Sequence, residues 1–421
     1  MDESDFKGHL TGEVRWGMNG AYCYFQPHDL PFDWECSRAT MALESAAARE
    51  LARLDGMLRS AGEDVFSMLV MNISLMESAS SSSIEGTRST VDDVLRSEKE
   101  APSDSERIED NREIANYRRA LLYGFDNVPV GGRLTVDLVK TLHRILMEDA
   151  RGSDMTSGEF KTRQNAIGRA TDTLETAKMV PAPPEAVDHL LDNWLEYVNS
   201  ARFDTVEKAA VAHYQFECIH PFRDGNGRVG RLLLLLVLRR DGLLRYPVLF
   251  LSGYLDLRRD RYIDLMYGVS SRDALDEWVG FMSKGLEEQA MSTAAIAESL
   301  TGYRRELLSR AADANDIRAI EMLFANPYVT SKDLVSGLGV SPPTANKILK
   351  RFEAAGILRE VSGRERNRLY LAEDIMRILR RRRSTKPRSS LFLHVTYYIR
   401  KLDASSNRGF SWTSSYSRSF R

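Results

Sequence analysis

The sequence is poor in cysteine and has no long apolar segment. Its three cysteines, Cys23, Cys36 and Cys218, are widely spaced, so they predict neither a disulfide framework nor a metal site and fit a reducing, cytoplasmic location. The longest strongly apolar run, Leu232–Leu238, is far shorter than the ~20 residues that span a bilayer. A signal peptide is not expected, because residues 1–5 are acidic. We therefore expect no membrane association and no disulfide-rich secreted fold.

Charge is nearly balanced overall but unevenly distributed. The formal net charge is −2, whereas residues 381–421 contain ten Lys or Arg and one acid, a local +9 that leaves −11 for residues 1–380. This basic, Ser-rich end lacks helical periodicity, and we expect a disordered tail that either contacts nucleic acid or is merely solvated. With 421 residues, 43% of the sequence hydrophobic and 28% charged, the chain can form two or three ordinary globular domains.

Residues 220–231, HPFRDGNGRVGR, carry the densest chemical pattern in the chain. His220 can accept a proton near neutral pH, and Asp224 offers hard carboxylate oxygens of the kind that Mg²⁺ uses beside phosphates. The Gly-Asn-Gly turn lets backbone N–H groups approach an anion at a helix start. Arg228 and Arg231 share a helix face and can fork onto phosphate oxygens. The pattern predicts a nucleoside triphosphate site; the structural alternative is a polar loop that caps a buried helix.

This stretch resembles the signature of the Fic (Fic/Doc) family, HPFx[D/E]GNGRxxR, at every fixed position. Members with the complete motif are protein adenylyltransferases, which move AMP from ATP to a protein hydroxyl, so the resemblance implies ATP and Mg²⁺. It implies His220 as the general base and Asp224 as the Mg²⁺ ligand. The implied nucleotide contacts come from Phe222, Asp224, Gly225, Asn226, Gly227, Arg228 and Arg231. Among them, Phe222 would anchor the loop, Asn226 would reach the α-phosphate and Arg231 would fix the γ-phosphate. Gly227 favours AMP transfer, since the phosphorylating Doc branch departs from the motif there.

A second motif lies upstream in SSSIEG, Ser81–Gly86, at the end of a helical pattern that covers about residues 64–86. Alone, this serine-rich stretch is also typical of a flexible linker. Ser81 and Glu85 are four residues apart and would share one helix face. The stretch resembles the inhibitory-helix motif [S/T]xxxE[G/N] of many Fic proteins. That resemblance implies that Ser81, Glu85 and Gly86 are inhibitory and that Glu85 pairs with Arg231, blocking the place of the γ-phosphate.

The segment 157–184 predicts a β-hairpin from about residue 163 to 181. It resembles the Fic flap phrase GEFRxxQNxIG, which implies that Gln164, Asn165 and Ile167 hold an extended target segment by strand addition. The structural alternative is a plain surface hairpin. Tyr262 stands where the family often has a Tyr-Tyr pair near the adenine, although Ile263 replaces the second ring.

Periodicity and resemblance together predict a mainly α fold. We expect an N-terminal helical region (1–100), a Fic-type helical core with a β-hairpin flap (101–300) and a winged helix-turn-helix domain (313–378). Residues 1–35 and 97–112 are expected to be irregular. The winged helix could bind DNA through exposed Lys and Arg, but interspersed glutamates favour a protein-interaction or homodimer role.

Three functions remain compatible with the sequence. The first is an autoinhibited adenylyltransferase that modifies Ser, Thr or Tyr of a protein, including itself. The second is an enzyme that chiefly removes AMP, with Glu85 orienting water. The third is a winged-helix regulator whose core only senses nucleotide.

Overall fold

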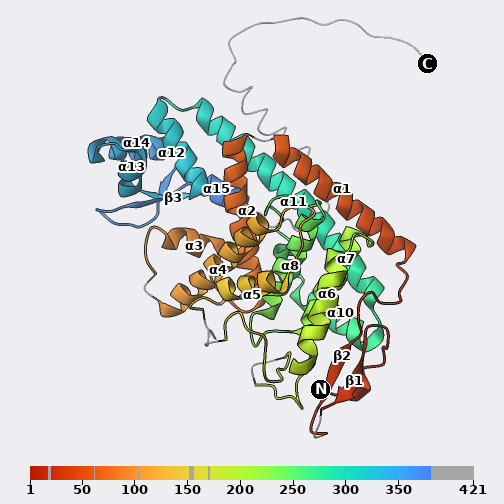
Figure 1. Cartoon of the computed structure of the whole chain (residues 1–421). Coiled ribbons are helices and arrows are strands. Elements are labelled where there is room, and N and C mark those ends of the chain that lie inside the picture. Colours follow the sequence, from red (N-terminus) through yellow and green to blue (C-terminus); the bar gives the residue numbers. More distant parts are fainter. Residues whose placement is uncertain (18–19, 61, 103, 151–155, 169–170, 381–421) are drawn as a thin grey trace, which may run out of the picture. The chain divides into compact units, whose positions relative to one another are not determined.

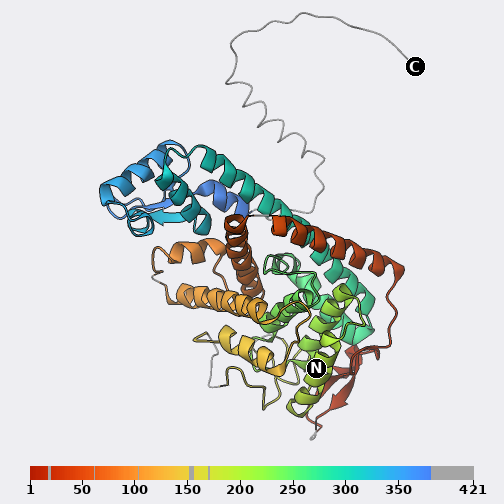
Figure 2. The ribbon, with the colours of Figure 1, turned by 45° about the horizontal axis from the view of Figure 1, so that its top comes forward.

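A 35-residue helix, α11 (Leu275–Ser309), is the longest helix in the described residues. The computed structural model describes residues 1–17, 20–60, 62–102, 104–150, 156–168 and 171–380 (Figure 1). The predicted tail, 381–421, lies outside these residues. α1 (Arg38–Ser60) packs along α11, as both ribbon views show (Figures 1 and 2). Because α11 continues past residue 300, one helix joins the expected core to the region that follows it.

The N-terminal segment is not irregular, which corrects our expectation for residues 1–35. A 3₁₀ turn, η1 (Glu3–Asp5), precedes strands β1 (Gly12–Trp16) and β2 (Cys23–Pro27), which pair antiparallel with Trp16 opposite Cys23. The Phe25 N–H donates to the Val180 carbonyl at 2.8 Å. The hairpin is thus fixed partly by a contact 155 residues away, which local propensity does not reveal.

The central helices surround α8 (Asn226–Arg240), the helix that begins inside the 220–231 motif. Every residue of Leu232–Leu238 is at most 1% exposed, so this apolar run is buried on all sides of the helix. Its direct neighbours include α2, α4, α5 and α7. The helices of this region are α2 (Glu63–Ile84), α3 (Val91–Ser97), α4 (Ser105–Asn127), α5 (Val136–Leu146), η2 (Pro184–Ala186), α6 (Val187–Asn199), α7 (Thr205–Ile219), α9 (Ser252–Leu257) and α10 (Arg259–Arg272).

The loop expected at 97–112 is shorter than predicted. α4 already begins at Ser105, and the Asp104 side chain caps it by accepting from the Glu106 N–H at 3.1 Å. Of the charged residues expected in this loop, Glu106, Arg107 and Arg112 are exposed on the first turns of α4, whereas Asp110 is buried. None of the helices in the described residues is long and apolar enough to cross a membrane.

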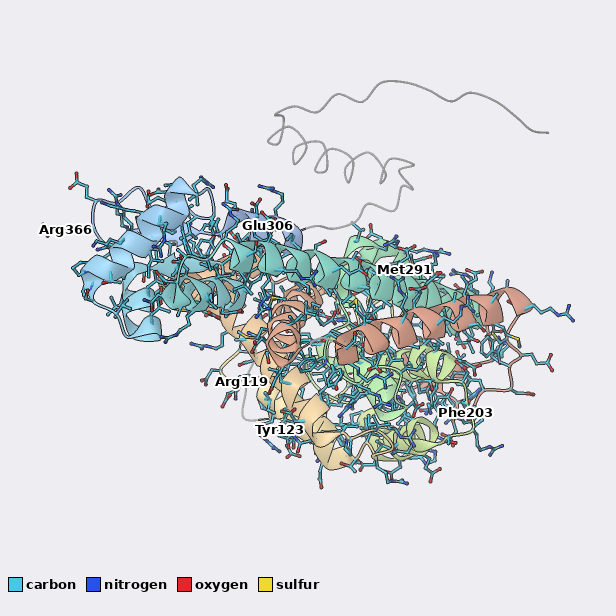
Figure 3. All side chains as sticks on the ribbon, turned by 90° about the horizontal axis from the view of Figure 1, so that it is seen from above. Arg119, Tyr123, Phe203, Met291, Glu306 and Arg366 are labelled. Carbon is cyan, nitrogen blue, oxygen red and sulfur yellow. The ribbon has the colours of Figure 1, made fainter. Side chains whose placement is uncertain are left out.

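The winged helix is present at the end of the described chain, as predicted. It comprises α12 (Ala314–Ala325), β3 (Tyr328–Thr330), α13 (Ser331–Leu338), α14 (Pro342–Ala354), β4 (Arg359–Glu360), β5 (Leu369–Leu371) and α15 (Glu373–Leu379). The strands form an antiparallel sheet in the order β3-β5-β4. Thr330 caps α13 through a complete capping box, and Ser341 caps α14 with Pro342 at its first position. Arg366 lies at the outer edge of this domain (Figure 3).

Candidate active site

His220 ends α7 in a left-handed conformation, with φ 48° and ψ 59°. Its backbone N–H caps the helix by donating to the Phe216 carbonyl at 2.9 Å. The side chain is 17% exposed, and Nδ1 lies 3.3 Å from the Glu217 carbonyl oxygen. Burial and the nearby Lys161 ammonium lower the pKa of His220 to about 3. The imidazole is therefore neutral at physiological pH and can accept a proton.

Asn226 braces the loop between α7 and α8. Its Oδ1 accepts from the Phe222 N–H at 2.8 Å, and its Nδ2 donates to the Phe222 carbonyl at 2.8 Å. The Phe222 ring is buried and stacks on His143 with 3.8 Å between ring centroids. Because both polar groups of the Asn226 amide already have partners, the expected contact with an α-phosphate would require this side chain to share or exchange a hydrogen bond.

His143 holds the same loop from α5. Its Nδ1 accepts from the Gly158 N–H at 2.8 Å, so the proton resides on Nε2, which lies 3.0 Å from the Asp224 carbonyl oxygen and donates to it. Burial lowers the pKa of His143 to about 4, which keeps the ring neutral. The Asp224 side chain itself is exposed at the start of α8, and its Oδ1 accepts from the Gly225 N–H at 2.6 Å.

The start of α8 has the features of an anion site. Gly225 has a positive φ of 76°, and an added Cβ would lie 3.0 Å from the Met147 sulfur, so a side chain is excluded. The first backbone N–H groups of α8 have no intrahelical acceptor. Arg228 is 5% exposed, and its Nε and Nη1 have no hydrogen-bond partner in the described structure. Nη1 lies 3.7 Å from a Glu113 carboxylate oxygen. Buried, unsatisfied guanidinium donors beside a helix start fit a phosphate-bearing ligand.

A carboxylate already occupies this end of α8. Glu85 Oε1 accepts from Arg231 Nη2 at 2.7 Å, and it lies so close to Gly227 that an added Cβ would be 2.3 Å from it. Ser81 contributes two more contacts, since its Oγ and its carbonyl oxygen each accept from the Arg231 guanidinium at 2.9 Å. The ion pair that we expected between Glu85 and Arg231 is therefore present.

The electrostatics of this pair keep both groups charged. Burial alone would raise the pKa of Glu85, but the Arg231 guanidinium outweighs it and lowers the pKa. Burial likewise acts to lower the pKa of Arg231, whereas Glu85 raises it well above its usual range. The Arg231 side chain is only 2% exposed and that of Glu85 is 39% exposed. Gly86 follows with φ 104° just beyond the end of α2, which stops the helix directly after Glu85.

The predicted flap is less regular than a β-hairpin. Between residues 163 and 181, the described backbone has one antiparallel bridge, Ile167 to Met179, and no longer ladder. Gln164 Nε2 donates to the Pro181 carbonyl at 2.8 Å, and Asn165 Nδ2 donates to the Phe222 carbonyl at 3.0 Å. Side-chain bonds thus replace strand pairing and attach the segment to the motif loop. The target-binding role of these residues stays a prediction.

Tyr262 lies inside the protein, beside the site. It is 3% exposed, and its hydroxyl lies 2.7 Å from Nε2 of His213. The ring is 5.8 Å from that of Trp278. Contact between Tyr262 and an adenine remains a prediction, and it would require access to a ring that is covered in this structure.

Comparison with protein-family models agrees with this geometry. Residues 133–238 match the Fic/DOC family model, 41–126 match the Fic/DOC N-terminal model, and 313–359 match a winged helix-turn-helix DNA-binding model. The chain contains a Fic/DOC region.

Individual Fic/DOC relatives match over part of the chain. Protein adenylyltransferase fic-1 of Caenorhabditis elegans is 32% identical over 157 residues, 37% of this chain and 27% of the relative. Probable protein adenylyltransferase aq_aa38 of Aquifex aeolicus (strain VF5) is 42% identical over 87 residues, 20% of this chain and 27% of the relative. This chain therefore spans about a quarter of the length of these relatives. A crystal structure of a Fic family protein from Desulfovibrio desulfuricans G20 has TM-score 0.53 and 19% identity, covering 80% of this chain and 97% of that one, which shows a shared fold.

Two buried ionisable residues beside His220 were not predicted from the sequence. Lys161 is 6% exposed, and its Nζ donates to the Ile219 carbonyl at 3.2 Å and to Asn165 Oδ1 at 3.0 Å. Glu217 is 7% exposed, and its Oε2 lies 3.7 Å from His220 Nδ1. The spacing of Glu217, one helical turn before His220, was a signal that could have identified it. Lys161 had no such local signal, because the fold alone brings it there.

Proposed function

We propose that this chain is an autoinhibited protein adenylyltransferase that transfers AMP from ATP to a hydroxyl of a protein, itself included. One observation carries the proposal: the Glu85 carboxylate pairs with the buried Arg231 directly over Gly227. A carboxylate there is negatively charged, as a phosphate is, and lies at the start of a helix, where the dipole favours an anion. The relatives named protein adenylyltransferase support the same class of reaction.

Each residue of the site would have its own role in AMP transfer. Nε2 of His220 would accept the proton of the target hydroxyl while its oxygen bonds to the α-phosphorus and pyrophosphate leaves. The start of α8, Arg228 and Arg231 would bind the phosphates and stabilise the charge that develops on the leaving group. The segment around Gln164 and Asn165 would position the target chain.

A magnesium ion fits this donor set. Asp224 is an exposed carboxylate next to the phosphate-binding residues, and Mg²⁺ commonly uses one or two carboxylates together with substrate phosphates and water. The described residues contain no cluster of three or more His, Cys, Asp or Glu that could hold a metal without a nucleotide. Asp224 would therefore hold the ion only together with ATP, and the ion would neutralise phosphate charge.

Release of Glu85 tests the proposal. Glu85→Gly should raise incorporation of α-labelled ATP into the protein itself and into candidate targets strongly, because Arg231 becomes available to the γ-phosphate. Relief of only ~1.4 kcal/mol of inhibition would give a tenfold rise. Ser83→Ala is the matched control, since Ser83 lies on the same helix end and contacts Asp256 rather than Arg231. Arg231→Ala should stay inactive, because it removes the phosphate anchor together with the partner of Glu85. A transfer rate within twofold of wild type in Glu85→Gly would refute autoinhibition.

Removal of AMP is a second candidate function of the same site. Its support is that Glu85 is ionised, partly exposed and close to His220, so it could orient a water molecule. Incubation of a pre-modified target without ATP separates the two activities. Loss of AMP that depends on Glu85 would favour the hydrolase, whereas no loss would favour the transferase.

Nucleic-acid binding is a further candidate for the winged helix. α14 exposes Asn346, Lys347 and Lys350. By contrast, Arg364 of the wing pairs with Glu100 at 2.6 Å, which removes part of the basic surface. Fluorescence anisotropy with duplex DNA at several salt concentrations tests this function, and Lys347→Ala with Lys350→Ala should weaken any binding and reduce its salt dependence.

A further inference from the structure

Glu217 touches the candidate base from the side opposite to its reacting nitrogen. The Glu217 backbone carbonyl lies 3.3 Å from Nδ1 of His220, and the Oε2 atom of the same residue lies 3.7 Å from Nδ1. A carbonyl oxygen can only accept, so this contact places the proton on Nδ1 and leaves Nε2 free to accept another. One residue therefore supplies both the tautomer-setting acceptor and a nearby carboxyl group.

The environment of Glu217 is unusual for a residue that only packs. Its Oε1 has no hydrogen-bond partner in the described part of the chain. Oε1 lies against the next helix, where a Cβ added to Gly230 would be 2.7 Å from it. A buried carboxyl with an unsatisfied oxygen costs stability relative to an apolar side chain of similar size. A purely structural role therefore accounts poorly for a carboxyl group at this position.

The Glu217 carboxylate can stabilise His220 once the histidine has accepted a proton. When Nε2 takes a proton, the ring becomes an imidazolium, and a carboxylate 3.7 Å from Nδ1 attracts its new charge. Burial strengthens that attraction, because the surroundings screen it less than water does. Lys161 opposes it, since its ammonium group lowers the pKa of His220.

We propose, building on the transfer function above, that Glu217 is a positioning residue for His220: it holds the ring with Nε2 free and stabilises the imidazolium formed during transfer. The target hydroxyl gives its proton to Nε2 while its oxygen bonds to phosphorus and pyrophosphate leaves. The imidazolium afterwards returns the proton to solvent, and Glu217 only balances the charge. This role is absent from the motif, which begins at His220.

The ionisation of Glu217 makes the proposal measurable. Burial raises its pKa to about 8, with Arg231 acting to lower it and Glu85 to raise it. The carboxylate form is populated as pH rises, so the turnover number should rise through the range in which Glu217 loses its proton. Removing Glu85 should move this rise to lower pH, because one negative neighbour is lost. The charged groups that act on His220 or on Glu217 are Lys161, Glu85 and Arg231. Among these groups, Lys161 titrates in a similar pH range to Glu217, because burial lowers its pKa to about 7.

The test compares variants of the Glu85→Gly protein in AMP transfer from labelled ATP between about pH 6 and 9, a span that brackets the pKa of Glu217. Glu217→Gln should lower kcat by about tenfold or more, leave the KM for ATP within about twofold and abolish the rise with pH. Lys161→Arg stays charged at every pH used and should keep the rise. An unchanged kcat and pH profile in Glu217→Gln would overturn the proposal, as would loss of the rise in Lys161→Arg alone.

A second variant keeps the test informative when Glu217→Gln misfolds. If circular dichroism shows that Glu217→Gln does not fold, Glu217→Asp replaces it. This shorter carboxylate withdraws from Nδ1, so it should lose kcat but retain a rise with pH; wild-type kcat would again overturn the proposal. Absence of any transfer by Glu85→Gly would instead refute the proposed function, and this inference with it.

Discussion

The start of α8 and the winged helix differ in how completely their buried polar groups are hydrogen-bonded. Around α8, His213 Nδ1, Glu217 Oε1 and two nitrogens of Arg228 are buried without hydrogen-bond partners in the described structure. Within residues 314–379, all of which are described, no buried side-chain nitrogen or oxygen lacks a hydrogen-bond partner. There the polar groups cap helices, as Thr330 does for α13.

We interpret this difference as one between a region that binds a ligand and a region whose polar groups stabilise the fold. Unsatisfied buried donors lower stability, and proteins tolerate them where a ligand or a conformational change can satisfy them. In the winged helix the buried polar groups instead have hydrogen-bond partners, and some partners of its polar side chains lie outside the domain, as Lys99 does for Asp333. Substitutions around the start of α8 should therefore mainly change transfer activity, whereas substitutions in the winged helix should mainly change stability.

The largest expected contrast is between His220→Ala and Arg366→Ala. Loss of a general base typically costs about 10²–10⁴-fold in rate, so His220→Ala in the Glu85→Gly protein should nearly abolish transfer while ATP still binds. Arg366 projects from the edge of the wing, and its removal should leave transfer unchanged (Figure 3). Labelled-ATP incorporation and calorimetry measure the two properties. Near-normal transfer by folded His220→Ala would remove this histidine from the mechanism.

A smaller but still large effect is expected for Asp224→Ala. It should weaken Mg²⁺-dependent ATP binding by about tenfold or more, since no other carboxylate lies within residues 220–231. Calorimetry with Mg-ATP and with metal-free ATP separates the metal contribution from direct contacts. Equal affinity of wild type and variant for Mg-ATP would place the metal elsewhere.

The parts of the molecule that the sequence predicted best are those that short stretches of chain determine. A glycine turn followed by a continuous apolar run is enough to indicate α8 and its burial, and the Ser-Pro start of α14 is a strong capping signal. Helix α2, which ends just before Glu85, was likewise predictable from periodicity, and the family resemblance indicated that Glu85 pairs with Arg231.

Features that depend on distant contacts were not predictable. The β1–β2 hairpin bonds to Val180, and the segment after Arg163 is held by side-chain bonds of Gln164 and Asn165 in place of a ladder. On α4, Glu106, Arg107 and Arg112 are exposed but Asp110 is buried, and composition alone cannot distinguish this arrangement from a charged loop. Lys161 was missed for the same reason, since only the tertiary fold brings it to His220.

Ser81→Ala should have a moderate effect on the inhibited site. It removes the Oγ acceptor of Arg231 Nε but keeps Glu85 and the Ser81 carbonyl contact. A hydrogen bond to a charged group contributes about 1.5–3 kcal/mol at most, and water can replace part of it in the open state. We therefore expect transfer to rise by a few-fold, clearly less than in Glu85→Gly, with Ser83→Ala unchanged. A rise equal to that of Glu85→Gly would mean that the serine, not the carboxylate, maintains inhibition.

The smallest expected effect is a pair of opposite pH dependences of stability. Burial raises the pKa of Glu217 to about 8, so the stability that its protonated form provides is complete below the unfolded pKa of about 4.3 and is lost as pH rises through 8. For Asp333 in α13, burial acts to raise the pKa, but hydrogen bonds from Thr330 and the charge of Lys99 outweigh it and lower the pKa. Its contribution is present above the unfolded pKa and is lost as pH falls through the folded one. Melting temperatures between about pH 3 and 9, a span that includes the unfolded-state pKa of about 4 of both carboxyl groups, should show Glu217→Gln gaining on wild type as pH rises. Asp333→Asn should instead lose to wild type at neutral pH and approach it in acid. Parallel curves for the two variants would contradict the contrast between the regions, since both carboxyl groups would then behave as ordinary surface acids.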